Sequence, residues 1–307
     1  MRLFAFAEDS GFKQIIAFLL IILFSALIFS GIGVVSAFLI WGGDVINEVG
    51  GMSSPQAVDA ARYMQGWFHA GMFLVPSLIF AALSGTGLGN YLSIKKFPAM
   101  KYLLFALALY IIASPLIGTL MEWNSHLSLP SWLSGVEEWM RSQEDKAKIA
   151  TEALMKTRTS AGLWANLLIM AVLPALGEEF MFRGVLMRWF SGFIKNIHLN
   201  IALTALLFSA LHMQFFGFFP RMALGILFGY LLYWSGSIWL PVIVHFLNNG
   251  SMVLLYYLFY KGSISVNPED IGTADSAYLL IFNTILVILG FVWFSRTSKS
   301  RGDTLKF

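Results

Sequence analysis

The feature that most constrains this chain is a series of long apolar runs, and the first of them, Ile15–Trp41, contains no charged residue. Apolar residues make up 58% of the sequence, charged residues only 12%, and the mean hydropathy is +0.73. About 20 consecutive apolar residues are enough to cross a lipid bilayer. The composition therefore predicts an integral membrane protein and excludes a soluble domain.

Further runs of this kind follow along the whole chain. Because lipid offers the backbone no hydrogen-bond partner, and because the runs lack the polar alternation of a barrel, helices are the expected solution. We predict an all-α polytopic membrane protein, a bundle of about eight transmembrane helices. The predicted spans are Ile15–Trp41, Met64–Ser84, Lys101–Met121, Ala161–Phe190, Leu199–Phe216, Met222–Trp234, Ile238–Tyr260 and Tyr278–Phe294.

Basic residues in the loops predict the orientation of the bundle. With eight spans, the clusters at 95–101, 188–195 and 296–306 fall on one side, which the positive-inside rule assigns to the cytoplasm. We therefore expect both termini to be cytoplasmic, in a bacterial cytoplasmic membrane. The net charge of +3 is scattered without a basic stripe, so no nucleic-acid partner is expected. Cysteine is absent, which excludes disulfides, a thiolate nucleophile and Cys-ligated metals.

The chain divides into three predicted regions: an N-terminal transmembrane region at 1–160, a core at 161–260, and a C-terminal helix with a basic tail at 261–307. The first region ends in a polar insertion at 122–160, expected on the outer side. There Trp132, Val136 and Trp139 recur at helical spacing among charged residues, which predicts an amphipathic helix at the interface. This helix is either a structural cap or a substrate-selecting lid.

A charged run interrupts the fourth apolar stretch. An ionisable group at membrane depth is costly unless it is paired or faces water, so it indicates a functional site. Glu179 and Arg183 stand at i, i+4, the favourable order for an ion pair on one helix face. Glu178 points about 100° away from that face. It therefore needs a partner from another helix, and it is the candidate general base or acid.

Further polar residues lie in two later apolar runs, namely His212 in the fifth, and His245 with Asn249 at i, i+4 in the seventh. A lone membrane histidine commonly makes an interhelical hydrogen bond without any catalytic role. Two histidines, an asparagine and two carboxylates on three helices at similar depth instead predict one site. By contrast, Gly225 and Gly229 form a GxxxG pattern, which indicates close helix packing.

These residues carry a family resemblance. Glu178-Glu179-x-x-x-Arg183, Phe208-x-x-x-His212 and His245-x-x-x-Asn249 resemble, in order, the three motifs of the CAAX protease and bacteriocin-processing family. That family comprises type II CAAX prenyl endopeptidases and their bacterial relatives. The resemblance covers roughly 160–260, which makes the region 161–260 the expected catalytic core. Residues 1–150 and the last span carry no comparable motif.

The resemblance implies an intramembrane endopeptidase that hydrolyses a peptide bond of a membrane-associated or lipidated substrate. Its partners would be a peptide or protein at the membrane and the lipid bilayer. Glu178, helped by His212, would activate water, and His245 with Asn249 would stabilise the oxyanion of the intermediate. Glu179 and Arg183 would hold the geometry of the site.

Two alternatives stay open. Because the family has also been described as metal-dependent, Glu178, His212 and His245 could be zinc ligands. The absence of a His-Glu-x-x-His motif and the nearby arginine favour a site without a metal or other cofactor. The second alternative is a non-catalytic scaffold, a bacteriocin-immunity protein or an ion- or proton-coupled transporter. An amide beside His245 favours an oxyanion site over a proton relay.

Overall fold

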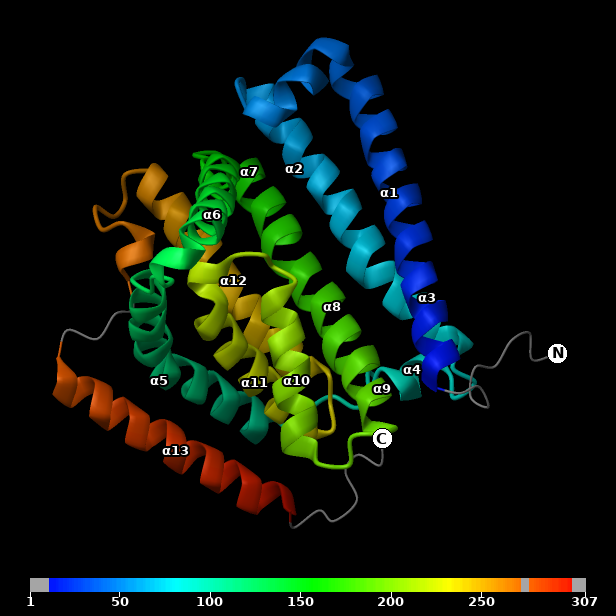
Figure 1. The fold of residues 1–307 in the computed structure, drawn as a ribbon, viewed down its shortest axis with the longest axis vertical. Helices are drawn as coiled ribbons and strands as arrows, with labels where there is room; N and C mark the ends of the chain where they lie inside the picture. Colours follow the sequence, from blue (N-terminus) through cyan, green and yellow to red (C-terminus); the bar gives the residue numbers. More distant parts are fainter. Residues whose placement is uncertain (1–10, 272–275, 300–307) are drawn as a thin grey trace.

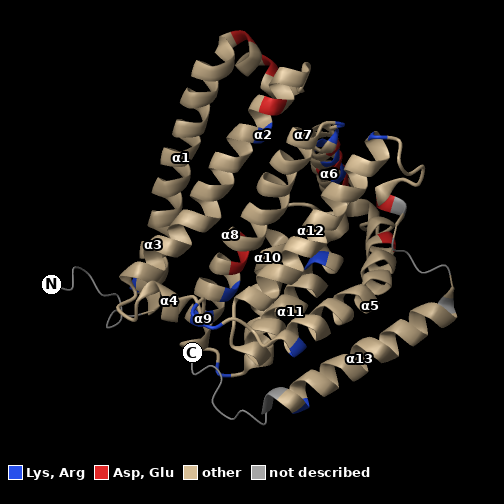
Figure 2. Cartoon of the chain, turned by 180° about the vertical axis from the view of Figure 1, so that it is seen from behind, with Lys and Arg blue, Asp and Glu red and all other residues tan. Residues whose placement is uncertain are grey.

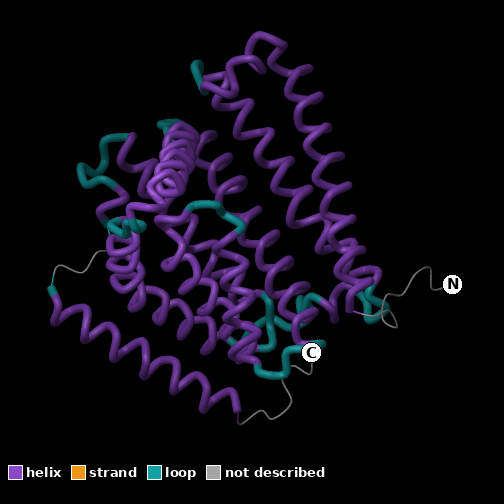
Figure 3. The backbone as a smooth tube through the Cα atoms, in the orientation of Figure 1, coloured by secondary structure: helices purple, strands orange, loops and turns teal. Residues whose placement is uncertain are grey.

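The computed structural model describes residues 11–271 and 276–299, and the described chain is helical, with no strand (Figures 1 and 3). The prediction of an all-α polytopic membrane protein is confirmed. Residues 1–10 and 300–307, which include most of the predicted basic tail, lie outside the described residues. Lys, Arg, Asp and Glu gather along α6 (Ser134–Met155), near other helix ends and in connecting segments, with a separate charged group on α8 (Leu173–Glu179) (Figure 2).

Seven helices of the described chain are long and apolar enough to cross a membrane, and an eighth apolar helix is shorter. The spans are Gly11–Gly51, Pro55–Leu83, Met100–Ser125, Ser160–Ser191, Phe215–Ser235, Trp239–Tyr260 and Tyr278–Thr297, and the short helix is Ile197–Ala210.

The predicted span Leu199–Phe216 is too long, because helix α10 (Ile197–Ala210) ends before it does. The chain then turns at 211–214, where Met213 adopts a left-handed φ of 54°. The next helix, α11 (Phe218–Ser235), accordingly begins before the predicted start at Met222. Hydropathy alone did not reveal this turn, since the residues around it are mostly apolar.

Two of the spans contain turns of π-helix, in which the backbone hydrogen bonds reach one residue further than in an α-helix. The first span of this kind runs through α2 (Pro55–His69), η3 (Ala70–Leu74) and α3 (Val75–Leu83). The second runs through α7 (Ser160–Asn166), η5 (Leu167–Val172), α8 (Leu173–Glu179), η6 (Phe180–Leu186) and α9 (Met187–Ser191). Pro76 and Pro174 follow η3 and η5 closely, and a proline has no N–H for the carbonyl four residues earlier.

The core lies where α8, α10, α11 and α12 (Trp239–Tyr260) meet (Figure 1). Gly225 and Gly229 face α10: a Cβ on Gly225 would lie 2.9 Å from Cβ of Ala205, and one on Gly229 would lie 2.8 Å from Cγ2 of Ile201. The predicted GxxxG packing is therefore present. It brings the backbones of α10 and α11 close together.

The remaining helices surround this core. Helix α1 (Gly11–Glu48) packs along α2 at one edge, and α13 (Ala277–Lys299) packs on α5 (Met100–Ser125) at the opposite edge (Figure 1). The short helix α4 (Leu88–Tyr91) follows α3. The polar insertion forms η4 (Ser131–Leu133) and α6 (Ser134–Met155).

Helix α6 is the amphipathic helix predicted within the insertion. Its Trp139 ring lies 5.5 Å from that of Phe215 in η7 (Phe215–Gly217), the turn that follows His212. The side chain of Glu144 accepts a hydrogen bond from the N–H of Phe216. At the end of α6, the carbonyl of Leu154 accepts hydrogen bonds from Arg62 on α2 and Asn166 on α7. The insertion is thus attached both to the segment after His212 and to the helices beside the core.

Candidate active site

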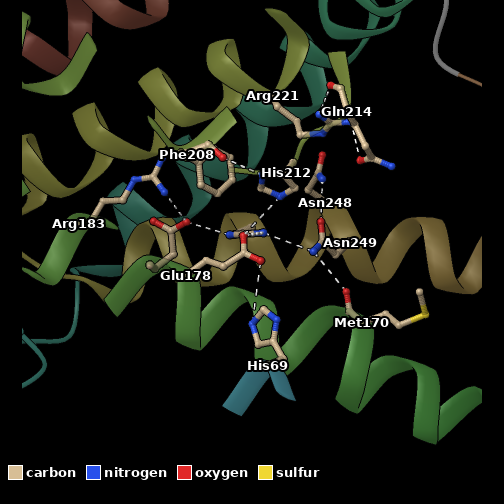
Figure 4. A network of polar contacts seen from close by, with 12 residues as sticks. His69, Met170, Glu178, Arg183, Phe208, His212, Gln214, Arg221, Asn248 and Asn249 are labelled. Atoms are coloured by element: carbon tan, nitrogen blue, oxygen red, sulfur yellow. Dashed lines mark hydrogen bonds and ion pairs between the residues drawn. The ribbon is translucent and has the colours of Figure 1, made fainter. Parts of the chain in front are cut away.

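The centre of the site is Glu178, whose residue is only 7% exposed. Three histidine side chains approach its carboxylate from three other parts of the chain (Figure 4). Nε2 of His245 and Nε2 of His212 lie 3.8 and 4.0 Å from Oε2 of Glu178. Nε2 of His69 lies 4.0 Å from Oε1. The predicted separation of Glu178 from local partners therefore holds, and its neighbours come from other helices.

These distances exceed those of direct hydrogen bonds, which run to about 3.2 Å for N–H···O. No hydrogen bond from the described part of the chain reaches the Glu178 carboxylate. Polar atoms 3.8–4.0 Å apart are instead suited to sharing a water molecule that hydrogen-bonds to both. A buried carboxylate beside two imidazole nitrogens is an arrangement that could hold and deprotonate a water.

Glu179 lies on a neighbouring face of the helix and is fully buried. Its Oε1 lies 3.0 Å from Nη1 of Arg183, and both side chains are 0% exposed. Arg183 also donates from Nη2 to the carbonyl of Gly225 at 2.8 Å. The structure thus places Glu179 and Arg183 in the i, i+4 pair that the sequence predicts, and it joins that pair to α11.

His245 connects the two glutamates. Its Nδ1 lies 2.8 Å from Oε1 of Glu179, while its ring stacks on Phe228 with the centroids 5.0 Å apart. Because the Glu179 carboxylate is paired with Arg183, it accepts a hydrogen bond from His245. Nδ1 of His245 therefore carries the proton. In the neutral ring Nε2 is then an acceptor, 3.3 Å from Nδ2 of Asn249. The sequence did not indicate that Glu179 would serve His245 as well as Arg183.

His212 follows the end of α10, and its side chain is 30% exposed, the most accessible of the three histidines around Glu178. Nδ1 of His212 lies 2.7 Å from the carbonyl oxygen of Phe208, to which it can only donate. This hydrogen bond leaves Nε2 as an acceptor on the side of Glu178. Phe208 therefore positions His212 through its backbone.

Asn249 is oriented by a chain of hydrogen bonds. Its Nδ2 donates to the carbonyl of Met170 at 3.2 Å, and its Oδ1 accepts from Nδ2 of Asn248 at 3.0 Å. Tyr110 on α5 donates in turn to Oδ1 of Asn248 at 3.3 Å. The carbonyl of Met170 lies four residues before Pro174, which has no N–H to offer it. The amide group of Asn249 is thus held with its donor side toward His245.

Sequence reasoning missed three residues at this site: His69, Asn248 and Tyr110. His69 is the last residue of α2, outside the three motifs. A histidine in the apolar run Met64–Ser84 was a usable signal, although the sequence does not show which helix that run contacts. Asn248 adjoins Asn249 in the sequence, but it does not share the helix face of Asn249 and His245. Tyr110 lies far from both asparagines in the sequence.

The alternative of a zinc ion bound by Glu178, His212 and His245 depends on which side-chain atoms are free to act as ligands. In the described part of the chain, no group of three or more His, Asp and Glu residues is arranged to hold a metal ion. Both ring nitrogens of His245 are engaged, with Glu179 and with Asn249. The fully buried guanidinium of Arg183 lies beside Glu179. These residues do not fit a zinc site.

The fold and the site together define an integral membrane protein with a buried carboxylate–histidine–amide cluster between its helices. Residues 160–251 match the family model described as type II CAAX prenyl endopeptidase Rce1-like. The matched segment contains Glu178, His212, His245 and Asn249, so the resemblance predicted from the motifs is confirmed, and it indicates a protease. No curated protein and no solved structure matches the chain. His69 and Tyr110 lie outside the matched segment.

Proposed function

We propose that this chain is an intramembrane endopeptidase that hydrolyses a peptide bond of a membrane-associated or lipidated substrate. The observation that carries the proposal is the buried Glu178 carboxylate, with Nε2 of both His212 and His245 within 4.0 Å of one of its oxygens. Peptide hydrolysis needs a base for water and donors for the developing oxyanion, and both kinds of group converge here.

In the proposed reaction, a water molecule lies between Oε2 of Glu178 and Nε2 of His212. His212 accepts a hydrogen bond from this water because its other ring nitrogen is committed to the carbonyl of Phe208. Glu178 takes a proton as the water oxygen attacks the carbonyl carbon of the substrate. When the C–N bond breaks, Glu178 returns that proton to the leaving amine.

The oxyanion would be stabilised by Asn249 and by His245. One N–H of Asn249 donates to the carbonyl of Met170, and the other, directed at Nε2 of His245, becomes available to the oxyanion when that nitrogen carries a proton. For His245 to donate as well, Nε2 must carry a proton in addition to Nδ1, which is directed at Oε1 of Glu179 at 2.8 Å. Preorganised donors of this kind contribute roughly 2.7–4 kcal/mol each to transition-state stabilisation.

The experiment begins with identifying a substrate. The full-length Glu178→Gln variant is expressed in bacterial membranes, and the peptides that copurify with it are identified by mass spectrometry. A recovered protein is then incubated with the wild-type chain and with Glu178→Gln in liposomes. We expect cleavage by the wild type alone.

Equal processing by both chains would refute the glutamate mechanism. A bound but uncleaved protein would point to a scaffold or an immunity protein. Ion or proton flux lost in Glu178→Gln, without proteolysis, would point to a transporter.

A further inference from the structure

We propose that His69 is a positioning residue of the same site, holding the Glu178 carboxylate through a shared water so that Oε2 faces His212 and His245. The inference rests on the proposed function for its catalytic consequence. It concerns a residue on α2, in the N-terminal region outside the segment that matches the protease family.

The two carboxylate oxygens of Glu178 have different neighbours. His212 and His245 both approach Oε2, at 4.0 and 3.8 Å, whereas His69 approaches Oε1, at 4.0 Å. A carboxylate turns readily about its last bond, because that torsion has broad wells. A partner on Oε1 fixes the rotation and leaves Oε2 as the oxygen that meets the attacking water.

The ring of His69 is itself held in place. It stacks on Phe73 with centroids 4.6 Å apart and an interplanar angle of 29° (Figure 4 shows His69 below Glu178). Gly177, next to Glu178, admits the ring, because a Cβ there would lie 3.2 Å from Nε2 of His69. The two helices therefore meet closely at this point, and a larger residue at 177 would push the histidine away.

Nε2 of His69 is buried and has no hydrogen-bond partner in the described protein. Leaving a buried polar atom unpaired costs free energy, and a phenylalanine at position 69 would fill the same space without that cost. A water between Nε2 and Oε1 of Glu178 satisfies both atoms, since a buried water needs at least two polar partners. A purely structural histidine does not explain why its unpaired atom is directed at Glu178.

The test uses the full-length chain in liposomes with the protein recovered by the Glu178→Gln trap. His69→Phe removes the polar atom and keeps a ring, and His69→Gln keeps a hydrogen-bonding group. We expect His69→Phe to lower kcat by about 10²-fold, the effect of misplacing a reacting group. KM should stay within about twofold, because substrate contacts are unchanged. His69→Gln should recover most of kcat, and the control His126→Phe, at an exposed site, should match the wild type.

Two further results keep the inference separate from the proposed function. If Glu178→Gln is inactive but His69→Phe has wild-type kcat, the inference is overturned and the protease function stands. If the wild type cleaves no substrate, the proposed function is wrong. Thermal unfolding then tests whether His69 positions Glu178. His69→Phe should then shift Tm differently in the wild-type and Glu178→Ala backgrounds, because coupled residues are not additive. Equal shifts in both backgrounds would mean that His69 only packs, which would overturn the proposal.

Discussion

Nδ1 of His245 lies 2.8 Å from Oε1 of Glu179, the same oxygen that lies 3.0 Å from Nη1 of Arg183. One carboxylate oxygen on α8 therefore joins a cation on its own span to an imidazole on α12. Because the Nε2 face of that imidazole is directed at Glu178, the adjacent glutamates act on one histidine from opposite sides. The doublet is a coupled unit, in which Glu179 holds His245 while the Glu178 carboxylate receives no direct hydrogen bond from the described residues.

We predict that Glu178→Gln lowers activity without lowering stability, whereas Glu179→Gln lowers stability. Glu178 makes no direct hydrogen bond with the described residues, so the isosteric amide should abolish cleavage of the trapped substrate while Tm stays near the wild-type value. Glu179→Gln leaves Arg183 buried without its counter-charge, which costs about 3–5 kcal/mol. Turnover and thermal unfolding in detergent measure both effects. Near wild-type turnover of Glu178→Gln would contradict the assignment.

Arg183→Ala should lower stability more than any exposed arginine substitution. It strands the buried Glu179 and removes a donor from the carbonyl of Gly225, at a cost of about 3–5 kcal/mol. Arg158→Ala is the control, because Arg158 is exposed and a surface substitution changes stability by about 0.5 kcal/mol or less. Chemical unfolding in mixed micelles compares the two. Equal free energies of unfolding would show that the buried pair has little net effect.

Asn248→Ala should reduce activity although Asn248 does not face Glu178. Without its Nδ2, the amide of Asn249 loses the partner that fixes its orientation. We expect kcat to fall by about tenfold, since a loosened catalytic group loses alignment, whereas Tyr110→Phe, one step further along the chain, should have a smaller effect. Asn90→Ala, at an exposed position of α4, serves as the control. Unchanged kcat in Asn248→Ala would mean that Met170 alone orients Asn249.

Gly225→Ala should destabilise the contact between α10 and α11. The added Cβ would lie 2.9 Å from that of Ala205 and 3.3 Å from Nη2 of Arg183, so the helices must separate. Overpacking of this kind costs about 1–3 kcal/mol. Gly135→Ala on α6 is the matched control, because nothing lies within 4 Å of a Cβ there. A Tm for Gly225→Ala at or above that of the control would refute close packing at this point.

Cleavage should survive exhaustive chelation. The ring nitrogens of His245 are engaged by Glu179 and Asn249, so its neutral imidazole offers no free lone pair for zinc. The measurement is turnover after treatment with excess chelator and removal of the complex, with zinc content followed by elemental analysis. Activity that disappears and returns only on adding zinc would overturn the metal-free mechanism.

The sequence by itself determined the membrane character and most of the spans, because hydropathy over about 20 residues is a local property. It also determined the Glu179–Arg183 pair and the isolation of Glu178, since both follow from the helical repeat. The ordered motifs, each on an apolar segment, were sufficient to indicate the protease family. These inferences need no knowledge of which helices touch.

Only the tertiary structure decided what surrounds Glu178. His69 is distant in the chain and reaches the site because α2 meets α8 at Gly177. Tyr110 reaches Asn248 from α5, and Pro174 leaves the carbonyl of Met170 to Asn249. Helix contacts in lipid depend on small residues, local π-turns and side-chain hydrogen bonds between distant segments, and periodicity along one helix does not encode them. The chain alone therefore indicated the candidate carboxylate, whereas helix packing determined which residues surround it.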